Sequence, residues 1–276
     1  MVKGFAELFS ESFSEYGNKF VSYLKVFVFL YLIPSIIYLI AIFGLAISFI
    51  GFENISKLAD SIKSSSGMNP EIAKEIMKLL PLNFWLIFAA LTLVMIIFSF
   101  LMQLSYLHIA LSKKSKVSFS EAFRVAKKYF WRYVGFSIVT LFFLAVLFLL
   151  LIIPGIIFMV YWVFAVYILV GENKGILESL SASKKLVKGR WWKVFGFFLL
   201  IVILAIVVDA TFSFVPLIGS IVPNLVVLPF IYLFFKNFYL DLRGSHRSVY
   251  PKLRNKGAKV SVKKISKKKK VSKKKK

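Results

Sequence analysis

Few side chains in the apolar parts of this sequence could take part in chemistry. Asp209 is the only charged residue between Val194 and Phe235, and Gln103 and His108 lie near the end of another uncharged stretch. An ionisable group inside an apolar segment can carry a proton or an ion. For these three residues we favour a structural role over a proton- or ion-carrying one. We expect Asp209 to lie near the boundary of its segment, and Gln103 and His108 either to form hydrogen bonds between helices or, for His108, to lie at the membrane interface.

No catalytic or metal-binding pattern is visible. The chain contains no cysteine, which excludes disulfides, thiolate nucleophiles and thiolate metal ligands. Its two histidines, His108 and His246, are far apart in the sequence, and a histidine-based metal site or triad needs further partners. General acid–base catalysis needs paired groups in a pocket. We therefore expect no enzyme and no cofactor, and we assign no catalytic, cofactor-binding or metal residues.

Basic residues, by contrast, cluster in two segments with a helical pattern, 117–136 and 171–197. Near a membrane surface, each basic residue contributes about 1 kcal/mol of attraction to anionic lipids. Eight of these cations are our candidate contacts for anionic lipid: Lys127, Lys128, Arg132, Lys184, Lys185, Lys188, Arg190 and Lys193.

Long uncharged runs separate these segments and predict an all-α membrane protein. Hydrophobic residues make up 59% of the chain, and an uncharged apolar run of about 18 residues or more is typical of a transmembrane helix. The runs 26–52 and 79–112 each provide one span. The runs 133–171 and 194–235 are each about twice as long as a ~30 Å hydrocarbon core requires. Each is therefore read as a hairpin, with turns at Pro154-Gly155 and around Pro216–Pro223, which makes six spans.

Charge predicts the orientation of these spans. Basic residues cluster in 113–132, in 174–193 and after 236, whereas the polar insert 53–78 balances four lysines with four acids. The positive-inside rule places basic loops in the cytoplasm. Six crossings with both termini in the cytoplasm satisfy every loop, and we expect a multi-pass protein of the plasma membrane.

The two ends of the chain differ from its middle. Residues 1–24 predict an amphipathic helix that lies in the membrane interface, and residues 25–242 form the six-helix domain. Residues 243–276 read as a disordered polybasic tail; sixteen Lys and Arg and no acid follow Asp241. In the first helix the aromatic and aliphatic stripe comprises Phe5, Leu8, Phe9, Phe13, Tyr16, Phe20 and Tyr23, and the polar face comprises Glu7, Glu11, Glu15 and Lys19.

The basic segments resemble each other. The sequence WRYVGF at 131–136 parallels WKVFGF at 192–197, an offset of 61 residues. Upstream the offset is 57, where Glu121 and Lys127-Lys128 match Glu178 and Lys184-Lys185. A weaker third copy has an offset of 110, where Glu11, Phe20 and Tyr23 match Glu121, Phe130 and Tyr133. The repeating unit would be an amphipathic helix on the cytoplasmic side followed by a helical hairpin.

The stretch 150–198 resembles the glycerophosphoryl diester phosphodiesterase membrane domain and related prokaryotic six-helix membrane proteins. The matching residues are Pro154, Gly155, Glu172, Glu178, Ser179, Ser183, Lys185, Leu186, Lys188, Gly189, Phe195 and Gly196. The resemblance implies a membrane fold and not an active site. In fused relatives the phosphodiesterase chemistry belongs to a separate barrel of about 200 residues or more, for which this chain has no room.

These patterns favour a non-enzymatic membrane protein that engages anionic lipids or a membrane-protein partner through its amphipathic helices and its basic tail. Two alternatives stay open. One is a transporter or permease, disfavoured because charged residues are scarce at the centre of the spans. The other is a membrane insertion or biogenesis factor whose tail docks ribosomes or RNA electrostatically, although no motif supports it.

Overall fold

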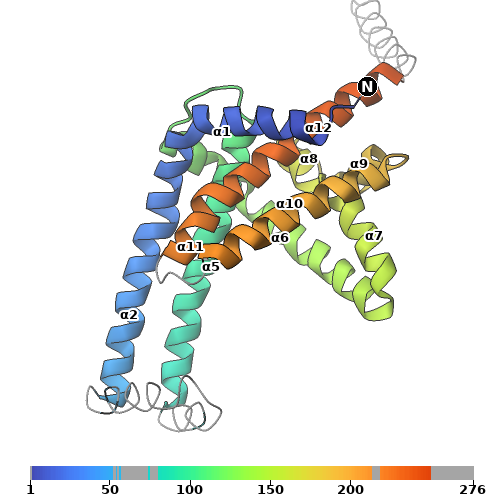
Figure 1. Ribbon diagram of the computed structural model, residues 1–276. Coiled ribbons are helices and arrows are strands. Elements are labelled where there is room, and N and C mark those ends of the chain that lie inside the picture. The colour runs from blue at the N-terminus through green and yellow to red at the C-terminus, as the bar shows by residue number, and fades with distance from the viewer. Residues whose placement is uncertain are drawn as a thin grey trace, which may run out of the picture. The chain divides into compact units, whose positions relative to one another are not determined.

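The computed structural model describes residues 2–51, 54, 56, 74, 80–212 and 218–249. Apart from residues 54, 56 and 74, the polar insert 53–78 lies outside the described residues, and so does the tail from residue 250 onward. Every regular element in the described part is a helix, as the sequence predicts. The elements are α1 (Phe5–Phe27), η1 (Val28–Leu32), α2 (Ile33–Ile50), α5 (Leu82–Leu111), α6 (Phe119–Leu150), α7 (Ile152–Trp162), α8 (Ala165–Gly171), α9 (Ile176–Val187), α10 (Trp191–Phe212), α11 (Ile218–Val222), η2 (Pro223–Val227) and α12 (Leu228–Val249) (Figure 1).

Six helical stretches of the described chain are long and apolar enough to cross a membrane. They are Phe5–Ile50, Leu82–Leu111, Phe119–Leu150, Ile152–Gly171, Trp191–Phe212 and Pro223–Gly244. These are the helices of a multi-pass membrane protein. The first stretch does not stop at residue 24, because α1 runs through η1 into α2 as one continuous helix.

Both π-helical turns precede a proline. η1 is followed by Ile33-Pro34 and η2 by Leu228-Pro229. Proline offers no N–H, and its ring collides with the carbonyl four residues earlier. In each case the residue before the proline bonds a carbonyl five residues back, Ile33 to Val28 and Leu228 to Pro223. The wider turn lets the helix continue past the proline.

The chain forms two compact units: residues 1–16, 140–214 and 230–276 make the first, and residues 17–139 and 215–229 make the second. In the second unit α2 and α5 run side by side (Figure 1), and Tyr38 and Thr92 share a hydrogen bond of 3.1 Å between their hydroxyls. The second half of α1 packs on the last turns of α5, where the Tyr23 and Tyr106 rings meet edge-on at 5.3 Å.

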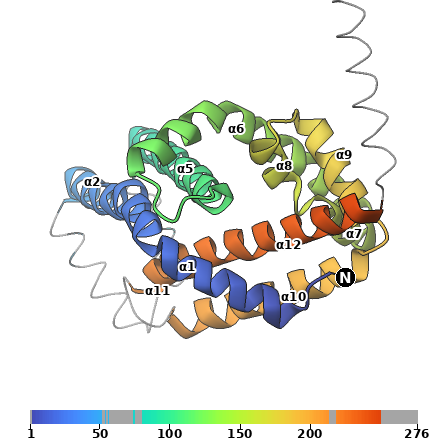
Figure 2. The same cartoon turned by 90° about the horizontal axis from the view of Figure 1, so that it is seen from above.

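In the first unit α12 is the central helix. Its Phe234 and Phe238 are fully buried. The start of α1 lies alongside α12 (Figure 2), with Phe5 against Phe234 at 5.3 Å and Phe9 against Phe230 at 4.9 Å. Phe5 also contacts Phe197 of α10 at 5.4 Å. An aromatic cluster therefore holds three helices together in this unit.

The turn between α6 and α7 falls at Leu151, three residues before the predicted breaker Pro154-Gly155. Leu151 has an extended conformation, with φ −157° and ψ 128°. Pro154 lies in the first turn of α7, where its missing N–H has no intrahelical partner to lose. A Cβ atom on Gly155 would come within 2.7 Å of the Phe148 ring. Gly155 therefore permits close contact between α6 and α7 beside the turn.

Candidate functional site

The segment from α7 to α10 contains the motif that the sequence singles out, and its buried serine has a structural role. Ser183 of α9 is fully buried. Its hydroxyl donates to the carbonyl of Tyr161 at 2.7 Å and accepts the N–H of Phe164 at 3.2 Å. Those two backbone groups flank the break between α7 and α8, where no intrahelical partner is available. Ser183 thus provides hydrogen-bond partners for the two backbone groups at the helix break.

Glu172, after α8, is also engaged within the first unit. It accepts a hydrogen bond from the Tyr239 hydroxyl and lies 3.3 Å from both the Lys174 ammonium and the Arg243 guanidinium. Burial alone would raise the pKa of Glu172. The hydrogen bonds from Tyr239 and Lys174 and the positive charges of Arg243 and Lys174 outweigh it and hold that pKa below its ordinary value. Glu172 joins the end of α8 to α12.

Gly189 ends α9 at the position where the offset of the predicted repeat changes. Its φ of 84° is a left-handed conformation that favours glycine. Residues 188–190 therefore interrupt the helix between α9 and α10, whereas α6 continues unbroken through the corresponding region. The change of offset from 57 to 61 residues falls at this interruption.

Three exposed cations of this motif lie together at the end of α9. Lys184, Lys185 and Lys188 are exposed, and the Lys184 ammonium lies 4.8 Å from the centre of the Phe158 ring and 5.7 Å from that of Tyr161. Trp192 follows directly, with 79% of its surface exposed. We call Lys184, Lys185, Lys188 and Trp192 the α9 face.

The other two cations predicted in this segment, Lys193 and Arg190, are less exposed. Lys193 donates to the carbonyl oxygens of Val2 and Lys3 at 3.0 and 2.8 Å, so its ammonium fastens the start of the chain to α10. Arg190 is half-buried. Neither belongs to the exposed surface, and we leave both out of the α9 face.

A matching surface occurs on α6, in the second unit. Lys127, Lys128 and Arg132 are exposed; Lys127 lies over the Phe123 ring at 4.8 Å, and the other two lie over Tyr129 at 5.6 and 5.8 Å. Trp131 has 81% of its surface exposed. We call Lys127, Lys128, Arg132 and Trp131 the α6 face. Both faces thus combine exposed cations with a tryptophan, and these two tryptophans are aligned in the predicted repeat.

At the start of α6, one of the two hydrogen bonds of a capping box is present. The Ser118 hydroxyl accepts the N–H of Glu121 at 3.2 Å, which is the usual N-cap bond. The Glu121 carboxylate turns instead to Lys114, whose ammonium lies 3.0 Å from both of its oxygens. His108 Nε2 lies 3.8 Å from the same carboxylate.

The three polar residues predicted inside the spans lie on α5 and α10, each helix within its own unit. Gln103 receives a hydrogen bond from the Tyr133 hydroxyl at 2.9 Å, which links α5 to α6 within the second unit. His108 lies five residues further along α5. Asp209 is exposed on α10 in the first unit. The interhelical hydrogen bond expected of Gln103 is thus present.

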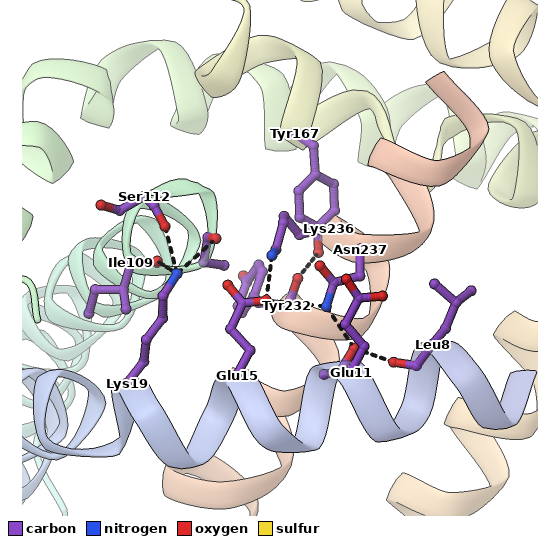
Figure 3. A network of polar contacts seen from close by, with 12 residues as sticks. Leu8, Glu11, Glu15, Lys19, Ile109, Ser112, Tyr167, Tyr232, Lys236 and Asn237 are labelled. Atoms are coloured by element: carbon purple, nitrogen blue, oxygen red, sulfur yellow. Dashed lines mark hydrogen bonds and ion pairs between the residues drawn. The ribbon is translucent and has the colours of Figure 1, made fainter. Parts of the chain in front are cut away.

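Sequence reasoning missed the buried charges of α1. Glu15 and Lys19, assigned to the polar outer face, point inward, whereas Phe13 of the apolar stripe is 64% exposed. In the first unit the Lys236 ammonium contacts Glu15, and the Asn237 amide donates to Ser12 and Glu15 at 3.0 and 3.2 Å (Figure 3). Hydrogen bonds and an opposite charge compensate the burial of Lys236.

Lys19, in the second unit, is buried against backbone carbonyl groups. Only 4% of its surface is exposed. Its ammonium donates to the carbonyl oxygens of Ile109, Ala110 and Ser112 at 2.9, 3.4 and 2.6 Å (Figure 3). These carbonyls are at the C-terminal end of α5, where a cation is favoured.

Comparison of the chain with protein-family models, curated proteins and solved structures found no match. The resemblance over residues 150–198 therefore stays a prediction, and the functional argument depends on the two faces.

Proposed function

We propose that this chain is a non-enzymatic, multi-pass membrane protein that holds anionic phospholipids at the headgroup layer through the α9 and α6 faces. The observation that carries the proposal is their shared composition. Each pairs three exposed cations with one tryptophan that is about four-fifths exposed.

Charge supports an anionic ligand. The acid of α9, Glu178, lies near the start of that helix, 3.7 Å from Lys174, and the three lysines of the face lie at its other end. On α6, Glu121 is occupied by Lys114. Each face therefore presents positive charge to which phosphate groups are complementary, worth about 1 kcal/mol per basic residue near a membrane.

The aromatic residues support a location at the membrane surface. Tryptophan is enriched where headgroups meet hydrocarbon, because its ring is apolar and its N–H is polar. Trp131 precedes the apolar run of α6, and Trp192 precedes that of α10. Lysines beside such residues keep their charge among the headgroups while their stems cover apolar surface. With the positive-inside rule, both faces would lie on the cytoplasmic side of the plasma membrane.

The test is retention of lipid after extraction from nanodiscs that contain equal amounts of phosphatidylglycerol and phosphatidylcholine. One variant carries glutamine at Lys184, Lys185 and Lys188, a second carries it at Lys127, Lys128 and Arg132, and a third combines all six changes. A control removes three other exposed lysines, Lys25, Lys113 and Lys116. Each protein is measured by native mass spectrometry, with and without residues 251–276.

We expect each face variant to lose phosphatidylglycerol about tenfold or more relative to phosphatidylcholine, since three cations are removed. The control variant should lose much less. Equal retention by the six-fold variant and the control would overturn the proposal. A retained small solute in place of lipid would support the transporter alternative, and loss of anionic lipid only when residues 251–276 are deleted would move binding to the tail.

A further inference from the structure

The apex of the α6–α7 hairpin, in the first unit, is entirely apolar. Five consecutive side chains, Leu149 to Ile153, are each between 65% and 88% exposed. No polar side chain occurs between Thr140 and Tyr161. The α2–α5 hairpin of the second unit differs, because a polar insert with eight charged residues lies between its helices in the sequence. If this apex emerged into water, all five aliphatic side chains would be exposed to solvent, which is unfavourable.

At the apex, both backbone groups of the turn residue are paired. The N–H of Leu151, the turn residue, donates to the carbonyl of Leu147 at 3.0 Å, and its own carbonyl accepts the N–H of Gly155 at 3.4 Å. Pro154 has no N–H to satisfy. Polar backbone groups must be paired in hydrocarbon, and the turn residue meets that requirement at both of its groups.

The depth of the apex follows from the contacts of α7. Ser183 of α9 bonds Tyr161, Lys184 lies over Phe158, and the indole N–H of Trp191 donates to the carbonyl of Ile157 at 3.3 Å. The α9 face therefore lies beside residues 157–161 of α7. From Tyr161 to the start of α7 at Ile152 the helix advances by about 14 Å, at 1.5 Å per residue, whereas the hydrocarbon core is about 30 Å thick.

We propose that the α6–α7 hairpin is re-entrant: it enters the membrane from the side of the α9 face, and Leu149–Ile153 end among the acyl chains near the middle of the bilayer. Since α6 advances by about 28 Å from Trp131 to Leu150, this depth requires α6 to run obliquely through the bilayer, whereas α7 covers the shorter way back. The inference depends on the proposed function, which places the α9 lysines among the headgroups. The occupant of the exposed apex is lipid hydrocarbon. Both ends of the hairpin stay on one side, so the expected location of the termini does not change.

Spin labelling tests the depth directly, and the absence of cysteine in the native chain makes single-cysteine variants clean. The full-length protein in liposomes is labelled with a nitroxide at Leu151→Cys, with Ile153→Cys as a second apex position. Lys188→Cys reports the α9 face, and Asn83→Cys, exposed at the start of α5 beside the polar insert, is the reference for water access. Collision with oxygen and with a water-soluble nickel chelate gives the depth of each label, and an impermeant maleimide gives access from each side.

We expect both apex labels to collide with oxygen and not with nickel, and the unlabelled cysteines there to react with the maleimide at least tenfold more slowly than Asn83→Cys from either side. An apex that reacts as fast as Asn83→Cys, or lies at the opposite headgroups, would show that the hairpin crosses and overturn the inference. Apex labels shielded from both reagents would mean that protein covers them, which also overturns it. The proposed function fails separately if the Lys188→Cys label lies away from the headgroup layer.

Discussion

Ser183 and Tyr161 are 22 residues apart in the sequence, yet the hydroxyl of the first donates a 2.7 Å hydrogen bond to the carbonyl of the second. The same hydroxyl accepts the N–H of Phe164. One side chain thus pairs both backbone groups at the break between α7 and α8 and fixes α9 against them. The position of the α9 face depends on this contact.

The first prediction concerns Ser183→Ala. Removal of the hydroxyl leaves a buried carbonyl and a buried N–H without their partner, which we expect to cost about 1–3 kcal/mol of unfolding free energy. The measurement is denaturant unfolding in detergent micelles. Ser179→Ala is the matched control, because the Ser179 hydroxyl bonds only the Gly175 carbonyl, which also accepts the Ser179 N–H. Equal losses in the two variants would contradict this role of Ser183.

The second prediction concerns the buried pair of Lys236 and Glu15. Lys236 is 7% exposed, and its removal leaves a partly buried carboxylate with fewer partners. Lys236→Met should therefore cost about 3–5 kcal/mol. The double variant with Glu15→Leu should be less destabilised than the sum of the two single variants, since it buries no unpaired charge. The coupling energy is obtained from the unfolding free energies of the native protein, the two single variants and the double variant. If the losses of the two single variants simply add up in the double variant, Lys236 and Glu15 are not coupled.

Sequence periodicity and charge predicted the helical class and the six long apolar helices, because both features depend on local composition. The uncharged run that ends at Phe235 already indicates a helix as far as that residue. That α12 continues to Val249 with Lys236 and Asn237 buried was not predictable, since their burial depends on the distant partners Ser12 and Glu15. A charge after an apolar run usually marks the membrane boundary.

The faces of α1 were predicted less well than its existence. Its apolar residues recur at helical spacing, but which side is covered depends on packing partners. Lys19 is buried because the end of α5 offers three carbonyl oxygens, which no pattern within residues 1–24 specifies. The lysines of the α9 and α6 faces could be selected from the sequence, because they cluster in charged segments beside long apolar runs. Lys193 was not distinguished from them, because its acceptors are backbone carbonyls near the N-terminus.

The third prediction concerns Lys19→Met, which keeps the length of the side chain and removes its ammonium. Three carbonyl oxygens at the end of α5 lose a charged donor, so we expect a loss of about 1.5–3 kcal/mol in unfolding free energy. Lys25→Met, at an exposed position on the same helix, should change it by less than about 0.5 kcal/mol. Faster amide hydrogen exchange confined to the last turn of α5 in Lys19→Met would locate the effect, and unchanged exchange there would contradict it.

The fourth prediction is a pH dependence that comes from Glu172. Because its pKa is lower in the folded protein than its ordinary value of 4.5, the carboxylate stabilises the fold fully above that value. The contribution is lost as the pH falls through the folded pKa, since protons then bind more readily to the unfolded chain. Glu172→Gln removes the charge at every pH, so it should lower the unfolding midpoint by about 2–4 °C at pH 7.

Below pH 4.5 the midpoints of Glu172→Gln and the native protein should converge, because the native carboxyl group becomes neutral as well. Thermal unfolding from pH 7 to pH 3.5 measures the difference. Glu178→Gln is the control: its carboxylate is 63% exposed and pairs with the same Lys174, so the change should have little effect at any pH. A difference between Glu172→Gln and the native protein that stays constant down to pH 3.5 would show that the ionised carboxylate does not tie α8 to Tyr239 and Arg243.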